Sequence, residues 1–214
     1  MTKSGRSQPG PYILLAAVAI LLAVASLALF LLNRPPGNSS AEAGFARDMA
    51  VHHAQAVEMA EIARDRTGDE QIRILATDIA LTQQAQIGRM QGWLDAWGLP
   101  ATGTEPTMVW MGHPTEGRMP GMATPEEINE LRNMPPQEMD KQFLRLMIPH
   151  HQAAIPMAEA ALERTDRPEV EQLAGAIAAT QRLEIENMQN MLQERGAEPV
   201  TEDSQAHDHG AHDH

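Results

Sequence analysis

The sequence predicts an all-α protein whose main body is a four-helix bundle, preceded by one N-terminal transmembrane helix. The segment 45–98 recurs as 143–196 with a constant offset of 98 residues, which indicates two copies of one structural unit. Each copy contains two long runs with apolar residues at spacings of three and four, the period of amphipathic helices. Aromatic residues make up only 3% of the chain, which suits close-packed helices better than a β-sandwich.

The strongest match between the copies is a pair of adjacent histidines. The first copy reads Phe-Ala-Arg-Asp-Met-Ala-Val-His-His from Phe45 to His53, and the second reads Phe-Leu-Arg-Leu-Met-Ile-Pro-His-His from Phe143 to His151. Because each feature can be checked against its twin, agreement between the copies is stronger evidence than any single motif. The same offset relates Met59 to Met157, Gln83 to Gln181, Met90 to Met188, and Gly98 to Gly196.

Composition excludes several classes of partner and site. The 214 residues carry a formal net charge of −13, which argues against a nucleic-acid partner because such binding needs a basic surface. The chain has no cysteine, so disulfides and thiolate metal sites are excluded. Any soft metal ligand must therefore be methionine or histidine, and methionine occurs 14 times.

Residues 12–32 form an unbroken apolar run that is long enough to cross a bilayer as a helix. Lys3 and Arg6 precede it without any acidic residue, so residues 1–11 are expected in the cytoplasm and the bundle outside it. A polar linker, 33–44, follows. The alternative is a cleavable signal peptide, because Ala41-Glu-Ala43 resembles a cleavage site. Both interpretations place the bundle outside the cytoplasm, either membrane-anchored through a single pass or secreted.

Two helical hairpins make up the predicted bundle, 45–196. The first comprises a helix from Phe45 to about Arg66 and a second from about Glu70 to Trp97, ended by Gly98 and Pro100. The second hairpin runs from about 139 to 164 and from about 168 to 195.

Prolines mark two further features of the second half. Pro149 and Pro156 predict a kink beside the second histidine pair, or a helix that starts near Pro149. The Met-rich crossover 101–142 is expected to be largely irregular, with one short helix after a capping box at Thr124 and Glu127. The tail 197–214 is polar and rich in histidine.

The helical period places the histidine pairs on the apolar stripes of their helices. At 100° per residue, His52 falls inside the apolar stripe that contains Met49, and His53 falls at the edge of that stripe. The second copy repeats this geometry. Facing stripes would bring imidazoles and thioethers together, a donor set that suits Cu(I) or its mimic Ag(I). Gln83, Gln86, Gln181 and Glu184 could hold imidazole N–H groups from the partner helices. The predicted metal ligands are Met49, His52, His53, Met59, Met90, Met147, His150, His151, Met157 and Met188.

Two further groups are candidates for secondary metal sites. In the crossover, thioethers and one imidazole could capture a soft ion in a flexible loop: Met108, Met111, His113, Met119 and Met122. In the tail, four histidines could chelate Cu(II) or Zn(II): His207, His209, His212 and His214. For any single position the alternative is structural, since methionine commonly fills gaps in helical cores.

The pattern Phe-x3-Met-x2-His-His-x5-Met-Ala at Phe45–Ala60 and Phe143–Ala158 resembles the signature of the DUF305 family. The short segments Met147-Ile-Pro-His-His and Gly121-Met122 are similar to sequences of that family as well, and the resemblance covers about residues 44–198. It implies a ferritin-like four-helix bundle, because members of the family have that fold and include extracytoplasmic copper-binding proteins of the CopM type. Carried over by position, it implies metal contacts at Met49, His52, His53, Met147, His150 and His151. The copies differ at Val51 against Pro149 and at Gln86 against Glu184, so the two halves are not expected to bind metal equally.

The sequence therefore predicts an extracytoplasmic copper-binding protein for copper tolerance, buffering or hand-off, with a metal-transfer partner or a homo-oligomer as further expectations. The alternative is a membrane-anchored structural or interaction module in which the histidines only satisfy hydrogen bonds in the core. A metal-dependent oxidoreductase is a third interpretation. It is disfavoured because the sequence identifies neither a substrate pocket nor a proton-transfer residue, and no enzyme activity is expected.

Overall fold

The computed structural model describes residues 10–32 and 34–201, and the chain divides into two compact units, residues 1–36 and 37–214. Within the described residues every regular element is helical, apart from an isolated bridge between Thr107 and Thr115. The all-α prediction is confirmed. The elements are α1 (Pro11–Leu32), α2 (Ala41–Arg66), α3 (Glu70–Trp97), the 3₁₀ turn η1 (Val109–Met111), α4 (Pro125–Asn133), α5 (Pro136–Arg164) and α6 (Pro168–Glu194).

Helix α1 forms the first unit and contains the predicted apolar segment. Residues Tyr12–Leu29 have a mean hydropathy of 2.7, so this helix is long and apolar enough to cross a membrane. A signal sequence near an N-terminus has the same length and composition, so these properties suit an anchor and a signal equally. The predicted cytoplasmic residues 1–9 lie outside the described residues.

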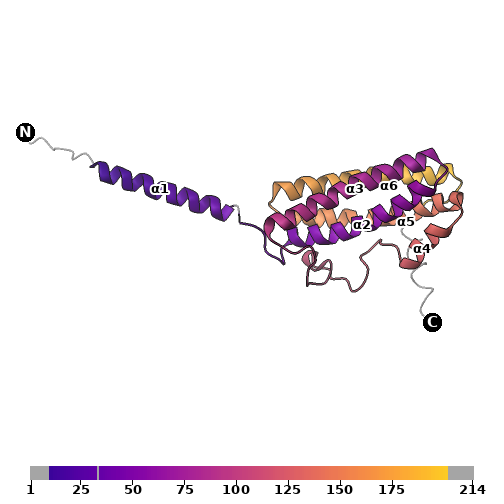
Figure 1. The fold of residues 1–214 in the computed structure, drawn as a ribbon, viewed down its shortest axis with the longest axis horizontal. Coiled ribbons are helices and arrows are strands. Elements are labelled where there is room, and N and C mark those ends of the chain that lie inside the picture. Colours follow the sequence, from indigo (N-terminus) through magenta and orange to yellow (C-terminus); the bar gives the residue numbers. More distant parts are fainter. Residues whose placement is uncertain (1–9, 33, 202–214) are drawn as a thin grey trace, which may run out of the picture. The chain divides into compact units, whose positions relative to one another are not determined.

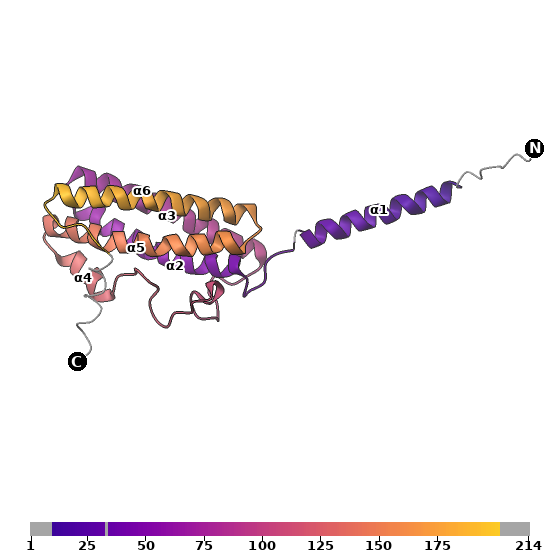
Figure 2. The same ribbon diagram turned by 180° about the vertical axis from the view of Figure 1, so that it is seen from behind.

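Four long helices make up the body of the second unit. Helix α2 packs against α3 and α5, and α5 packs against α6. The two views show these helices lying side by side, with α4 at one end (Figures 1 and 2). The crossover between α3 and α5 runs along the outside of α2 and α5 (Figures 1 and 2). This arrangement agrees with two hairpins joined by one long connection.

Local capping explains where most of these helices begin and end. Helix α2 starts at Ala41 because the side chain of Ser40 accepts a hydrogen bond from Ala43 N at 3.2 Å. The last four residues assigned to the linker are therefore helical. Helix α3 ends at Gly98 in the left-handed region, with φ 69°. Helix α4 has the predicted capping box between Thr124 and Glu127.

Helix α5 is continuous through both of its internal prolines, Pro149 and Pro156. The prediction of a helix start near Pro149 is therefore wrong, because the helix begins at Pro136. A proline inside a helix costs about 3 kcal/mol. Burial of a large apolar side chain contributes about 1.5–3 kcal/mol. Both Met147 and Ile148, next to Pro149, are fully buried, so packing outweighs the loss of a helical hydrogen bond.

The two hairpins are joined by a reciprocal pair of side-chain contacts at their ends. Thr165 Oγ1 donates a hydrogen bond to Glu42 Oε1 at 3.1 Å. In the equivalent position Thr67 lies beside Asp140, where it opposes the rise in the pKa of Asp140 that burial causes. Asp140 is the counterpart of Glu42, and Thr165 is the counterpart of Thr67, at the offset of 98. Each copy thus binds the interhelical turn of the other.

Candidate metal centre

A belt of polar side chains crosses the middle of the helical body. Each of the four long helices contributes two residues to this polar belt: His52 and His53, Gln83 and Gln86, His150 and His151, and Gln181 and Glu184. On either side lies an apolar cluster. The α4-end cluster contains Ile128 and Leu131 of α4, whereas the η1-end cluster contains Met108 and Met111. The belt is therefore a polar layer between two apolar clusters.

All four belt histidines have an exposed fraction of 0%. The rings of His52 and His150 lie closest, with centroids 3.8 Å apart, so the two copies meet at these residues. Within each pair the rings lie farther apart, at 6.5 Å for His52 and His53 and 6.3 Å for His150 and His151. The structure thus brings the two predicted histidine pairs together at the contact between α2 and α5.

Most imidazole nitrogens of the belt are buried without a hydrogen-bond partner. Among the described residues these atoms are His52 Nδ1, both nitrogens of His53, both nitrogens of His150, and His151 Nδ1. An unsatisfied buried polar group costs about 1–3 kcal/mol. Gln83 and Gln181, which are also buried, have unpartnered side-chain atoms as well. Because buried polar groups usually have hydrogen-bond partners, this many unpaired nitrogen and oxygen atoms in one layer indicate a site that binds a ligand.

Only two ring nitrogens have partners within the described part of the chain. His52 Nε2 lies 3.3 Å from the carbonyl oxygen of Pro120, and His151 Nε2 lies 2.8 Å from Glu184 Oε2. The second contact confirms the prediction that Glu184 can hold an imidazole N–H. Gln86 occupies the equivalent place in the first copy, yet its Oε1 is buried without a partner.

Burial keeps three of these imidazoles, those of His52, His53 and His150, neutral. Desolvation lowers the pKa of His52 to about 4, and the Pro120 carbonyl partly opposes this effect. Desolvation also lowers the pKa of His53 and of His150 well below the ordinary value, and the neighbouring histidines add to the effect. A neutral imidazole has a free lone pair, which is the form that binds metal ions.

The predicted methionine ligands flank the belt on both sides, and all are fully buried. The η1-end cluster contains Met49, Met90 and Met157, and the α4-end cluster contains the equivalent trio Met147, Met188 and Met59. Each trio draws two members from one copy and one from the other. The duplication therefore produces two matching sets of thioethers, one on each side of the histidines.

Within residues 10–32 and 34–201, no three His, Asp or Glu side chains are grouped so that they could hold an ion on their own. A metal bound at the belt would thus take thioethers as well as imidazoles. This mixed donor set fits a soft ion such as Cu(I) and does not fit Mg²⁺ or Ca²⁺, which prefer oxygen ligands.

The crossover is packed rather than loose. Met108, Met111 and Met119 are buried in the η1-end cluster, and Met122 is half-buried against it, whereas His113 is exposed. The secondary metal site at these residues stays a prediction, and its methionines pack against the core rather than standing in a loose loop. His207, His209, His212 and His214 lie outside the described residues.

One part of the crossover covers the belt, and we name residues 119–123 the strap. Gln55 joins it to α2 through two hydrogen bonds, from its Nε2 to Ala123 O at 2.9 Å and from Ala123 N to its Oε1 at 2.7 Å. Gly121 has φ 73°, and a Cβ added there would lie 2.4 Å from Pro149 O. The strap therefore contacts α2 and α5 beside the histidine pairs.

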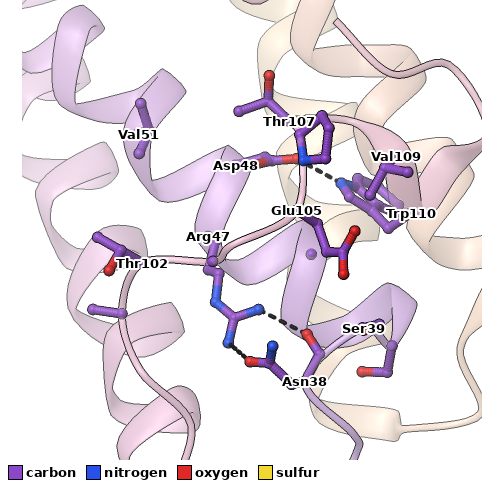
Figure 3. A pocket seen from close by; sticks show the side chains of 15 residues that line it. Asn38, Ser39, Arg47, Asp48, Val51, Thr102, Glu105, Thr107, Val109 and Trp110 are labelled. Carbon is purple, nitrogen blue, oxygen red and sulfur yellow. Dashed lines mark hydrogen bonds between the residues drawn. The ribbon is translucent and has the colours of Figure 1, made fainter.

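A cavity of about 190 Å³ lies where the other part of the crossover meets the start of α2 (Figure 3). None of the belt histidines lines it. Asp48 Oδ2 accepts hydrogen bonds from Met108 N at 2.7 Å and from Trp110 Nε1 at 2.8 Å. Arg47 donates to Asn38 and to Pro100 O. Through these contacts the side chains of Arg47 and Asp48 hold the crossover against the start of α2.

The sequence patterns missed Gln55, Asp48 and the Pro120 carbonyl. A signal for the two side chains exists in the comparison of the copies. Asp48 and Gln55 correspond to Leu146 and Ala153, so each is polar in the first copy alone. Such unmatched polar residues mark where the first copy contacts the crossover. No comparable signal exists for a backbone carbonyl.

Comparisons with known proteins agree with this geometry. The model of the family described as "Domain of unknown function (DUF305)" matches residues 42–213. Among solved structures, the chain is similar to a DUF305 protein from Streptomyces coelicolor that is presumed to be secreted. The two are 45% identical with a TM-score of 0.74, over 77% of this chain and 99% of the other.

Two further relatives extend the comparison. CopM in its Cu(I)-bound form is 28% identical with a TM-score of 0.56, over 72% of this chain and 96% of the other. CopM has also been solved with Cu(II) and with silver. An uncharacterised protein, L153 of Acanthamoeba polyphaga mimivirus, is 46% identical over 56 residues. Those residues span 26% of this chain and 37% of the viral protein.

Proposed function

This chain belongs to the DUF305 family, and from its histidine belt we propose that it binds copper, as Cu(I), outside the cytoplasm. The observation that supports this most is the set of buried imidazole nitrogens without hydrogen-bond partners, flanked by two trios of buried thioethers. The similarity to CopM, which has been solved with copper and silver bound, supports it independently.

The proposed ligands are drawn from both copies. His52, His53, His150 and His151 would supply nitrogen, and the two methionine trios would supply sulfur on either side of them. When bound, Cu(I) would accept lone pairs from groups that are otherwise unsatisfied, and this would stabilise the folded state. We propose that the protein buffers copper or hands it on and so contributes to copper tolerance. We further propose that it does so from the outer face of a membrane when α1 is retained, or as a secreted protein when it is removed.

We propose a binding protein rather than an enzyme. The belt histidines are fully buried, and the cavity in Figure 3 lies at the crossover and not at the histidines. Incubation of the copper-loaded protein with O2 or peroxide should therefore show no turnover. Sustained consumption of either substrate would contradict this part of the proposal.

The proposal can be tested by competition for Cu(I) with a chromogenic chelator. The full-length chain would be used in detergent, with the four tail histidines replaced by alanine so that the tail does not contribute. A variant with His52, His53, His150 and His151 all replaced by glutamine should lose tight binding, while the exposed His113→Ala variant should keep it. Circular dichroism would establish that each variant remains helical.

Two results would refute copper binding at the belt. One is failure of the tail-free chain to compete for Cu(I). The other is equal affinity in the folded glutamine variant. A folded bundle that is indifferent to metal would favour the structural or interaction module instead.

A further inference from the structure

His52 and His151 share a feature that the other two belt histidines lack. Each has one ring nitrogen with an acceptor in hydrogen-bond range, and in both cases that nitrogen is Nε2. The acceptor of His52 is a backbone carbonyl, and the acceptor of His151 is a carboxylate oxygen. Because these acceptors have no hydrogen to donate, Nε2 must carry the proton in both rings.

In a neutral imidazole the proton on one nitrogen leaves a lone pair on the other. The Nδ1 atoms of His52 and His151 are buried and have no hydrogen-bond partner. We infer that His52 and His151 bind the metal through Nδ1, and that the Pro120 carbonyl and Glu184 are the positioning groups that impose this choice. The inference rests on the proposed copper binding and names the ligand atoms of that site.

The two positioning groups come from different parts of the molecule. Glu184 lies on α6, the hairpin partner of the helix that contains His151. Pro120 lies in the strap, which Gln55 holds in place through its two hydrogen bonds to Ala123. Gly121 lets the strap approach α5, because a side chain there would meet Pro149 O and Ala153. The strap therefore positions His52.

Histidines that bind metals commonly donate their second N–H to a carboxylate or a carbonyl, and this fixes the tautomer and the ring orientation. The belt contains one example of each acceptor. His53 and His150 have no such partner, so both of their nitrogens remain candidates for ligation. The four histidines are thus divided into two with a defined ligand atom and two without.

The test is ¹⁵N NMR of the full-length, tail-free chain in detergent, with ¹⁵N-labelled histidine. In the metal-free protein, His52 and His151 should carry hydrogen on Nε2. Addition of Ag(I), a diamagnetic mimic of Cu(I), should shift the Nδ1 resonances and leave the Nε2 protons in place. Hydrogen on Nδ1 in the metal-free protein, or a loss of the Nε2 proton on Ag(I) binding, would overturn the inference.

The same spectra separate this inference from the proposed function. If the rings show the expected tautomers but no belt nitrogen responds to Ag(I) or Cu(I), then copper binding fails while the positioning roles stand. If Ag(I) binds through Nε2, copper binding stands and the inference fails.

Substitution of Glu184 gives a second measurement. Glu184→Ala removes the acceptor, so His151 should become a mixture of tautomers. Loss of such a partner typically weakens metal binding about 10- to 100-fold. Glu184→Gln retains an acceptor oxygen and should restore a single tautomer and most of the affinity. Glu186→Ala, an exposed glutamate on the same helix, is the matched control.

The strap is tested through Gln55→Ala, which removes both of its hydrogen bonds to Ala123. The tautomer of His52 should then become mixed while that of His151 is unchanged. Unchanged tautomers and unchanged Ag(I) affinity in both Glu184→Ala and Gln55→Ala would overturn the positioning roles.

Discussion

The two histidine pairs occupy equivalent positions in a duplicated structure, yet they are held by different means. In the second half, Glu184 of the neighbouring helix accepts from His151. In the first half the equivalent residue is Gln86, and the structure instead places the strap carbonyl of Pro120 against His52. The comparison shows that duplication conserved the donor groups and that the groups orienting them were supplied separately in each half.

Acid should destabilise both halves of the belt together, because both contain buried neutral imidazoles. Unfolding exposes His52, so its pKa rises from about 4 towards the ordinary value of 6.5 and the unfolded state binds more protons between these values. Stability should therefore be complete above pH 6.5 and fall as the pH drops towards 4. His52 alone accounts for about 3 kcal/mol at 1.36 kcal/mol per pKa unit. Histidines 53 and 150, whose pKa values are also lowered, should add to the loss.

Denaturant unfolding of the metal-free chain between pH 7 and pH 4 measures this effect. A His52→Gln variant should show a shallower dependence on pH over that range. Equal unfolding free energies at pH 7 and pH 4.5 would contradict the assignment of buried neutral rings.

Asp48→Leu makes the first half resemble the second, which has Leu146 at this position. The change leaves Met108 N and Trp110 Nε1 without their acceptor. Burial raises the pKa of Asp48, so the carboxylate itself is costly, but loss of its hydrogen bonds should still lower the unfolding free energy by about 2–3 kcal/mol. Thermal unfolding checks this, with Leu146→Ala as a reference for simple loss of core volume in the other half. A stable Asp48→Leu variant would show that the crossover does not depend on this carboxylate.

Gly121→Ala should disturb the strap and hence only the first half. Its added Cβ would lie 2.4 Å from Pro149 O, and its φ of 73° disfavours side chains. Gly117→Ala is the matched control, because Gly117 has φ 91° but nothing within 4 Å of its added Cβ. Backbone strain alone costs about 1–3 kcal/mol. Gly121→Ala should lower the melting temperature by more than Gly117→Ala. Equal shifts would mean that the contact with α5 is unimportant.

Gln86→Glu should have the smallest effect and would give the first half the acceptor that the second half already has. His53 would then gain a carboxylate partner, and Ag(I) affinity should rise by a few-fold, well under the effect of Glu184→Ala. Isothermal titration calorimetry would measure the Ag(I) affinity of the Gln86→Glu variant and of the Gln86→Glu, Glu184→Gln double variant. A fall in affinity on Gln86→Glu would show that the halves are not interchangeable.

Much of the helical body could be predicted from local patterns. Periodicity located the helices, Gly98 and the capping box at Thr124 marked two of their ends, and the offset of 98 established the duplication. The predicted start of α5 at about residue 139 lies near the observed Pro136, whereas the alternative start near Pro149 is wrong because it rested on the intrinsic cost of proline and burial of the neighbouring residues decides the outcome. The crossover is largely irregular with one short α-helix, as its proline and glycine content predicts. Three of its methionines are nevertheless buried in the core.

The sequence by itself determined that the chain is helical, that it is duplicated, and that the histidine pairs face inward among methionines. These properties follow from spacing along one helix, which the order of residues specifies directly. Only the tertiary structure decided that His52 meets His150, that the strap lies over them, and that Nε2 is the hydrogen-bonded nitrogen of His52 and His151. The physical reason is that these contacts join residues 33 to 98 positions apart. One of them uses a backbone carbonyl, a group that every residue has and whose direction depends on the path of the folded chain.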